Sequence, residues 1–433
     1  MNLSRLFASN ILWRGTYLVT SLLVTVLMAR FLEAALTGEL MYYISLFTFV
    51  FMSASFSLES ALVYFSSSKK INDAKLFTFC LMWIPMVVFL LTPLFYYFFN
   101  SGKAIAGNLP LYLCGLLFVA GNLLITYFSS FFYAKHQNQY PNLVFIFTNL
   151  IIAFVLMWGL TDTSSLPKEW FTSFYFISFF VQGCICVLIF AKYQRSSFVF
   201  SLPSKDEAKL ILNYASIAIV ANILSFLLAR IDYWFIEWIT ANSIDLGNYI
   251  QASRLIQLFQ LLPVILASTI FPAASGGLRT DMVSVIQQLS RLIFWIYILV
   301  ITIIALTGNW LFPFVFGESF AAMYKMFLIL SPGLLATTLM ALICAYLAAI
   351  NKVRYNVWIS VAGLLLIVPL DLILIPRFGI TGAAFVSSAG YIISFITAFY
   401  FLKREEEVKL VDFLFIRRDD IAHLLRKLYE IVT

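Results

Sequence analysis

Long apolar runs separated by short polar segments repeat along almost the whole chain. A helix needs about twenty apolar residues to cross the hydrocarbon core of a bilayer, and each run reaches that length. The runs are continuous rather than alternating, which favours a bundle of helices over a barrel of strands. The predicted spans are residues 11–31, 40–64, 76–99, 109–133, 142–161, 169–191, 213–239, 247–270, 291–316, 322–347, 356–376 and 380–402. We therefore expect an all-α polytopic membrane protein with about twelve transmembrane helices.

The composition supports this interpretation and excludes several classes of protein. Hydrophobic residues make up 62% of the chain and charged residues 11%, against about 45–50% and about 25% in soluble domains. The net charge of +7 has no basic face on which to lie, so a nucleic-acid partner is not expected. The five cysteines all lie inside apolar runs, there are two histidines, and no phosphate-binding GxxxxGK[ST] motif occurs. We therefore expect no metal or organic cofactor, and leave open a coupling ion, Na⁺ or H⁺.

Lysine and arginine are distributed very unevenly between the two sides of the predicted membrane. With the N-terminus in the cytosol, 21 of the 28 fall in cytosolic segments and 5 in outer segments. Arg230 and Arg254, the remaining two, lie inside spans. Cytosolic loops carry an excess of positive charge in membrane proteins. This bias, with an even number of spans, predicts that both termini are cytosolic.

The longest connection between spans, about residues 192–212, divides the chain into two sets of six. Short matches relate the halves, for example residues 38–40 (GEL) and 247–249 (GNY) at similar places. Two copies of a six-span unit are related by an axis along the membrane normal, with the substrate path between them. We therefore predict two six-helix lobes, residues 1–200 and 201–403, around a central cavity.

The last segment, residues 404–433, differs from the spans. Apolar residues recur there at helical spacing around 419–432, with basic residues off that stripe. This pattern predicts an amphipathic helix on the cytosolic surface of the membrane. A helix that binds a partner protein is the alternative.

Several short motifs resemble one family of transporters. The most specific is residues 374–384, LIPRFGITGAA, which resembles the pattern LIPxfGixGAA. The others are Ala29-Arg30-Phe31-Leu32, Leu58-Glu59-Ser60-Ala61, Arg230-Ile231-Asp232, Gly247-Asn248-Tyr249 and Phe271-Pro272. The chain resembles the polysaccharide transporters, of the O-antigen flippase type, in the multidrug/oligosaccharidyl-lipid/polysaccharide exporter superfamily. Three departures occur: Glu33 and Ser57 stand where the family has Gly, and Asp371 where it has Asn.

The resemblance implies a function in assembly of cell-surface polysaccharide such as O-antigen or lipopolysaccharide. Such a protein flips a polyprenyl-pyrophosphate-linked oligosaccharide from the cytosolic to the outer leaflet of the bacterial inner membrane. Its partners would be that lipid-linked substrate, membrane lipid and polysaccharide assembly proteins.

Polar side chains inside the spans are the candidate substrate site, because polar groups in a bilayer are costly. Arginine offers a fork of donors that matches phosphate oxygens, whereas amides and phenols suit sugars. In the eighth span Arg254 has an amide one turn away on each side, and in the seventh Arg230 shares a face with Asn222 and Tyr233. The candidate substrate-binding residues are Arg254, Arg230, Gln251, Gln257, Tyr233, Asn222 and Arg14. For Arg14, near the boundary of the first span, snorkelling to the membrane surface is the alternative.

Three acidic residues inside the spans allow two roles each. They are Glu59, Asp232 and Asp371. Each either binds a coupling ion or serves as a structural charge within its lobe, and the sequence leaves both roles open.

Two other functions compete with the flippase. An ion-coupled multidrug exporter of the same superfamily would favour acidic, aromatic cavities over paired arginines. A membrane-embedded glycosyltransferase or polymerase would need a large loop or paired catalytic carboxylates, and the longest loop is about residues 192–212. A transporter working by alternating access, not an enzyme, is therefore the leading hypothesis.

Overall fold

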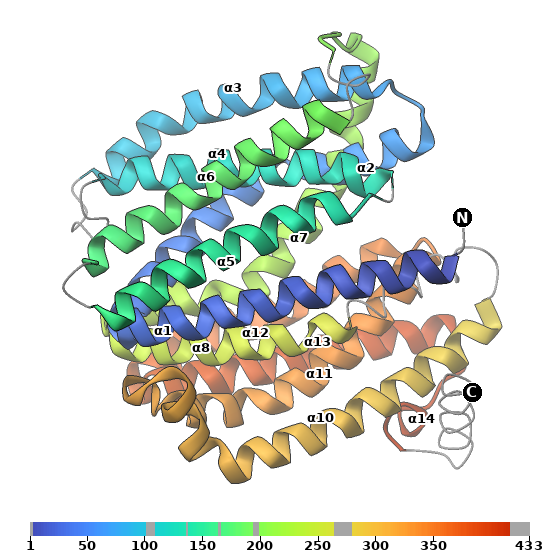
Figure 1. Ribbon diagram of the computed structural model, residues 1–433. Coiled ribbons are helices and arrows are strands. Elements are labelled where there is room, and N and C mark those ends of the chain that lie inside the picture. The colour runs from blue at the N-terminus through green and yellow to red at the C-terminus, as the bar shows by residue number, and fades with distance from the viewer. Residues whose placement is uncertain are drawn as a thin grey trace. The chain divides into compact units, whose positions relative to one another are not determined.

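The computed structural model describes residues 3–100, 109–135, 137–162, 166–193, 199–263 and 279–415. These residues form helices joined by short turns, with no strand among them (Figure 1). Ten of the described helices are long and apolar enough to cross a membrane. By their contacts, the residues group into a first unit, Met1–Ile223, and a second unit, Leu224–Thr433. An all-helical, multi-pass membrane protein is therefore confirmed, whereas the twelve spans, the lobe boundaries at residues 200 and 403 and the cytosolic termini stay predictions.

The first unit is built on aromatic packing between helices. Its helices are α1 (Leu3–Ser55), α2 (Leu58–Ser68), α3 (Asp73–Phe99), α4 (Leu111–Ala134), α5 (Gln139–Thr161), α6 (Lys168–Tyr193) and the first part of α7 (Lys205–Thr240). Phe47 is fully buried, and its ring lies 5.5 Å from Phe95 and 5.6 Å from Phe176. A Cβ atom at Gly121 would lie 2.6 Å from the backbone oxygen of Phe179, so α4 and α6 cross closely at this glycine. Small residues allow such approaches in membrane bundles.

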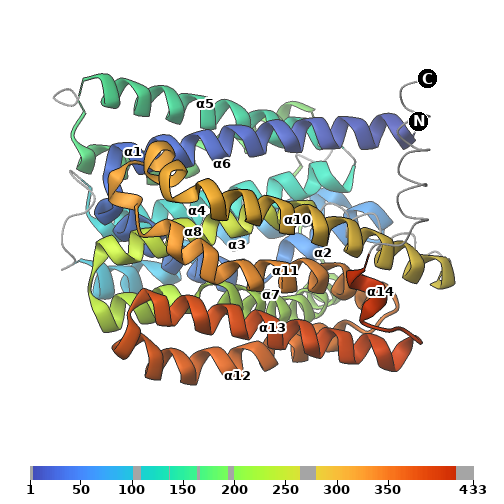
Figure 2. The ribbon, with the colours of Figure 1, turned by 90° about the horizontal axis from the view of Figure 1, so that it is seen from below.

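The second unit continues from the same helix α7. Its further helices are α8 (Ser243–Phe259), α10 (Arg279–Phe316), the short 3₁₀ helix η1 (Glu318–Phe320), α11 (Met323–Ala349), α12 (Val353–Phe378), α13 (Ile380–Glu405) and α14 (Val411–Leu414). Helices α12 and α13 run side by side in both views (Figures 1 and 2). They approach at two glycines, since a Cβ atom at Gly363 would lie 3.2 Å from the carbonyl oxygen of Gly390.

The first two predicted spans differ most from the structure. The range of α1 covers two helices that meet at Glu33, where the backbone is not helical. The second span, expected to be continuous over 40–64, breaks at Phe56 and Ser57, whose φ angles are 51° and 52°. Hydropathy alone could not show this break, because no proline or glycine marks it and the apolar run continues through it.

The backbone is left-handed at both positions where the family pattern has glycine and this chain has another residue. Glu33 has φ 62° and ψ 179°, and Ser57 has φ 52° and ψ 29°. The Glu33 conformation is occupied almost only by glycine and costs another residue about 1–3 kcal/mol. The turn geometry is therefore retained here without the residue that adopts it most easily.

Replacing Glu33 by glycine is expected to stabilise the protein by about 1 kcal/mol. Relief of backbone strain outweighs the loss of the exposed ion pair with Lys168, at 2.9 Å, which contributes about 0–1 kcal/mol. Thermal unfolding in detergent measures the effect. Glu33→Ala is the matched control, because it removes the same ion pair without relieving φ. A Gly variant no more stable than the Ala variant would show that the backbone at Glu33 is not strained.

The LIPRFGITGAA motif forms the turn between α12 and α13. Gly379 ends α12 and precedes α13 with φ 56°. A Cβ atom at Gly382 would lie 2.6 Å from the carbonyl oxygen of Leu374, and Ala383 and Ala384 are fully buried. The motif is thus explained by a reversal of the chain so tight that only small residues fit at the crossing.

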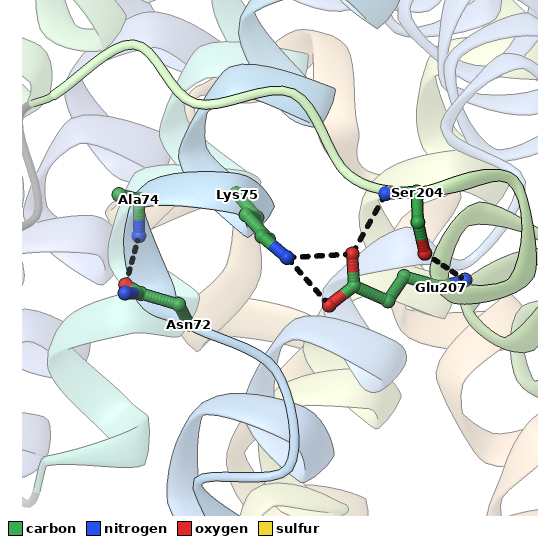
Figure 3. A network of polar contacts seen from close by, with 5 residues as sticks. All are labelled: Asn72, Ala74, Lys75, Ser204 and Glu207. Atoms are coloured by element: carbon green, nitrogen blue, oxygen red, sulfur yellow. Dashed lines mark hydrogen bonds and ion pairs between the residues drawn. The ribbon is translucent and has the colours of Figure 1, made fainter.

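The start of α7 is fixed to the start of α3 by a polar network (Figure 3). The ammonium of Lys75 lies 2.8 and 2.9 Å from the two carboxylate oxygens of Glu207. Glu207 also accepts from the backbone N–H of Ser204, whose hydroxyl accepts in turn from the N–H of Glu207. This reciprocal pattern is a capping box. Nearby, the N–H of Ser201 donates to the hydroxyl of Thr78 at 2.8 Å, so the chain entering α7 is held at two points.

The predicted tail helix around 419–432 lies outside the described residues, as do Phe271–Pro272 and the end of the eighth span. The last described element is α14, at Val411–Leu414.

Candidate functional site

The break between α1 and α2 accepts hydrogen bonds from side chains on three other helices. The carbonyl oxygens freed there accept hydrogen bonds from other helices: that of Ala54 from Trp83 at 2.9 Å, and that of Ser55 from the buried Tyr127 at 3.0 Å. The side chain of Asn222 on α7 donates to the Ser57 hydroxyl at 3.0 Å. Interrupted helices are tolerated at membrane depth only where such partners or water replace the lost bonds.

Glu59 lies in the first turn of α2, directly after this break. It lines a cavity of about 530 Å³, whose other lining residues are Ser60, Val63, Ile125, Thr126, Ser129, Ser130, Tyr133 and Phe145. One carboxylate oxygen of Glu59 is buried without a hydrogen-bond partner among the described residues, and so is the Ser129 hydroxyl. The cavity therefore combines one acid with hydroxyls and two aromatic rings.

In the second unit, Asp232 on α7 joins three helices through hydrogen bonds. Its side chain is 2% exposed. It accepts from the hydroxyl of Tyr249 on α8, from that of Ser387 on α13 at 2.8 Å, and from the backbone N–H of Tyr233 at 2.9 Å. Tyr249 and Ser387 also lie within hydrogen-bond distance of each other, at 3.1 Å. Of the two roles left open by the sequence, these contacts support the structural one for Asp232.

Arg230 begins a second polar chain on another side of α7. Its guanidinium donates to the side-chain oxygen of Gln257 on α8 at 3.0 Å. It also lies 5.6 Å from the ring centre of Phe226 and 5.9 Å from that of Tyr233. The Tyr233 hydroxyl donates to Ser253 at 2.8 Å. Among the described residues no carboxylate lies within ion-pair distance of Arg230, so its charge is held by an amide and two aromatic rings.

A pocket of about 280 Å³ adjoins this group of polar side chains through Ser253 and Gln257. It is lined by Ser225, Leu228, Ala229, Ser253, Ile256, Gln257, Gln260, Thr337, Met340, Ala341, Cys344, Asn356, Ile359, Ser360 and Tyr391. Amides and hydroxyls alternate with apolar side chains in this lining, and none of the lining residues is charged. Such a mixture suits a neutral, hydroxyl-rich group, with the positive charge of Arg230 linked to it through Gln257.

Asp371 on α12 is fully buried, and neither of its carboxylate oxygens has a hydrogen-bond partner among the described residues. Its neighbour Leu370 packs on an apolar cluster formed by Leu228, Ile367, Val386 and Tyr391. A buried carboxylate without donors is costly unless it holds a proton or a cation. Asp371 therefore stays a candidate for the ion role that the sequence left open. Among the described residues, no three His, Cys, Asp or Glu side chains come together as a metal site.

The structure brings together some of the predicted substrate residues and separates others. Arg230, Tyr233 and Gln257 form one hydrogen-bonded and aromatic group. Arg254 is half-buried on α8 and Gln251 is buried there, outside the lining of the pocket. Asn222 instead donates a hydrogen bond to Ser57 at the α1–α2 break. Arg14 lies on α1, and its side chain is outside the described part of the chain.

Several residues of these sites were not predicted from the sequence. Ser253 lies one turn before the predicted Gln257 on α8, a signal that could have been extended to Ser253. Tyr249 and Ser387 lie in different helices, and only the packing of α7, α8 and α13 places them at Asp232.

No family model matches the sequence, and no curated protein matches it. Solved structures do match. The lipid II flippase MurJ in an inward closed conformation superposes with a TM-score of 0.71 at 14% identity, covering 93% of this chain and 89% of that one. The MATE transporter VcmN of Vibrio cholerae gives 0.65 at 13% identity, with 95% and 99% covered. A MOP superfamily transporter from Pyrococcus furiosus gives 0.63 at 14% identity, with 93% and 94% covered. The chain therefore has the fold shared by these membrane transporters.

Proposed function

We propose that this protein is a transporter, not an enzyme, that flips a polyprenyl-pyrophosphate-linked oligosaccharide across the bacterial inner membrane by alternating access. The proposal places it among the polysaccharide transporters of the MOP superfamily, in the assembly of O-antigen or a similar surface polysaccharide. The observation that carries it is the environment of Arg230: a cation held by an amide and two rings, beside a pocket of amides and hydroxyls.

Phosphate binding needs a cation whose donors are not already used by a carboxylate. Arg230 meets this condition among the described residues, and its guanidinium has further N–H groups beyond the one that Gln257 accepts. Arg254, on α8 one turn before Gln257, is the second cation that we assign to substrate phosphate or an acidic sugar. The uncharged pocket that Gln257 lines is assigned to sugar hydroxyls, which amides and hydroxyls bind by paired hydrogen bonds.

The membrane potential supplies part of the driving force in this proposal. A cytosol-negative potential of 100 mV favours the outward movement of one negative charge by about 2.3 kcal/mol. A pyrophosphate with two charges would gain about 5 kcal/mol if both cross the whole field. We assign any further coupling, by Na⁺ or H⁺, to Asp371 in the second unit and Glu59 in the first.

An exporter of cationic drugs is the second candidate, and the cavity at Glu59 favours it. A carboxylate oxygen that has no hydrogen-bond partner among the described residues lines this cavity with Tyr133 and Phe145, and such a group is suited to an organic cation. The two candidates differ in the sign of the charge that is bound, so transport of an anionic and a cationic probe separates them.

Reconstitution of the full chain in liposomes tests the proposal. A fluorescent polyprenyl-pyrophosphate N-acetylglucosamine is placed in both leaflets, and a membrane-impermeant reductant then bleaches the outer pool. Flipping is expected to bring the inner pool to the reductant about tenfold faster or more than in protein-free liposomes, a difference of about 1.4 kcal/mol in barrier.

The same liposomes are assayed for uptake of ethidium as the cationic probe. Transport of ethidium without flipping of the lipid-linked sugar would replace the flippase with the exporter. Flipping of a plain fluorescent phospholipid at the same rate would show non-selective scrambling and contradict the proposed substrate.

A further inference from the structure

A separate pocket of about 310 Å³ lies where α2 ends and α7 begins, within the first unit. It is lined by Tyr64, Phe65, Lys70, Leu210, Asn213 and Tyr214. Its volume is at the lower end of the range of ligand sites, about 300–1,000 Å³. None of these residues belongs to the sites described above.

Two stacked tyrosines and a lysine form one wall of the pocket. The rings of Tyr64 and Tyr214 lie 4.7 Å apart at an interplanar angle of 12°. The Lys70 ammonium donates to the Tyr64 hydroxyl at 2.8 Å and lies 5.1 Å from the centre of that ring. This bond uses one of its three donors, so two N–H groups of a positioned cation remain for a ligand. Asn213 adds an amide and Tyr214 a phenol.

The charges around the pocket are predominantly positive. Lys205 and Lys209 precede Asn213 by two turns and one turn on the same face of α7, and both are exposed. The carboxylate of Glu207 is already held by Lys75. Asp206 is exposed one turn before Leu210 on the same face of α7, outside the pocket lining. It is the acidic residue on this part of α7 that does not pair with a lysine among the described residues. An anion is therefore the expected ligand.

Exposed apolar side chains occur in the pocket lining and in the segment that leads into α7. Phe200 and Leu202, just before α7, and Leu210 within it are all exposed. The backbone N–H of Ser201 is bonded to the hydroxyl of Thr78, so Phe200 and Leu202 are exposed although the backbone between them is fixed. Exposed apolar groups beside lysines at helix ends are typical of contact with anionic lipid.

We propose that this pocket binds the headgroup of an anionic phospholipid. The phosphodiester would accept hydrogen bonds from Lys70, Asn213 and Tyr214, and the glycerol and upper acyl chain would lie on Phe65 and Leu210. The site serves bilayer lipid, not the transported substrate, so it is independent of the flippase assignment.

Thermal unfolding of the full chain in a neutral detergent, with added lipid, tests this site. Dioleoylphosphatidylglycerol is expected to raise the unfolding midpoint at lower concentration than dioleoylphosphatidylcholine. Lys70→Gln should weaken the phosphatidylglycerol response about fivefold, and Lys70→Gln with Lys209→Gln about 25-fold, if each lysine contributes independently. Lys70→Arg should keep most of the response, because the charge remains.

Lys168→Gln is the matched control, because that lysine pairs with Glu33 far along the chain from the pocket. Its response to phosphatidylglycerol should equal that of the natural protein. If Lys70→Gln itself lowers the midpoint without lipid, native mass spectrometry of bound phosphatidylglycerol replaces the thermal reading. Equal responses to the two lipids, or an unchanged response in Lys70→Gln, would overturn the proposal. Inorganic phosphate that competes with the lipid would show a site for free phosphate instead.

Discussion

Arg230→Ala is expected to slow flipping of the lipid-linked pyrophosphate probe by about ten- to a hundredfold, while the protein still accumulates in the membrane. Hydrogen bonds to a charged group contribute about 1.5–3 kcal/mol each, and the substitution removes the cation that we assign to phosphate. Its contacts among the described residues are an amide and two aromatic rings, so the substitution breaks no ion pair there. Proteoliposome flipping rates and thermal unfolding midpoints, measured on the same samples, separate transport from stability.

Conservative and control variants sharpen this test. Arg230→Lys should retain part of the rate, since charge survives while the planar fork of donors is lost. Arg254→Ala belongs in the same series, and a loss as large as that of Arg230→Ala would place both cations on the substrate. Arg377→Ala removes an exposed arginine from the last turn of α12 and should flip normally. Normal flipping by Arg230→Ala would remove Arg230 from the substrate site. A loss of rate that follows a loss of folded protein would make it a structural residue.

Asp232→Ala is expected to destabilise the protein by several kcal/mol. The substitution leaves two buried hydroxyls, those of Tyr249 and Ser387, without their carboxylate acceptor. The backbone N–H of Tyr233 loses a second acceptor but lies inside α7, where a helical carbonyl still accepts from it. Each unsatisfied buried donor costs about 1–3 kcal/mol, although the two hydroxyls can still bond to each other. A large fall in the thermal unfolding midpoint, measured in detergent, is the expected result.

Asp232→Asn separates the hydrogen bonds from the charge. Its amide oxygen can still accept from the Tyr233 backbone, and both hydroxyls can turn to accept from its NH₂ group. The Asn variant should therefore keep most of the stability that the Ala variant loses. Glu407→Ala, which removes an exposed carboxylate from the same unit, controls for loss of one negative charge. If Asn is as damaging as Ala, the charge and not the hydrogen bonds is what this position requires.

The helices were predictable where apolar length alone determines them. The spans that became α3 to α6 and α11 to α13 agree with the expected ranges to within several residues, because about twenty apolar residues cross a bilayer in one way. The break at Phe56 and Ser57 was not predictable, since the hydrogen bonds that compensate it come from Trp83 and Tyr127 on other helices. The departures from glycine at Glu33 and Ser57 were the available signal.

In the candidate site, contacts within one helix were predictable from the sequence, whereas contacts between helices were not. Arg230 and Tyr233 lie close together, as their spacing of three residues on one helix predicts, while their role in binding substrate stays a prediction. Contacts between helices depend on rotation and register that periodicity does not give. Asp232 thus gained its partners from α8 and α13, and Asp371 was left without any among the described residues.

The pairing of Lys75 with Glu207 has a consequence for how the protein is made. The two residues are 132 positions apart in the chain. At about 5–20 residues per second, a ribosome adds that stretch in roughly 7–26 s. During that interval the start of α3 is already synthesised while its partner carboxylate does not yet exist. A fragment ending at residue 200 would stay in that immature state permanently, whereas one ending at Ile223 would include the whole clamp. Expression of the first unit alone should therefore extend into α7.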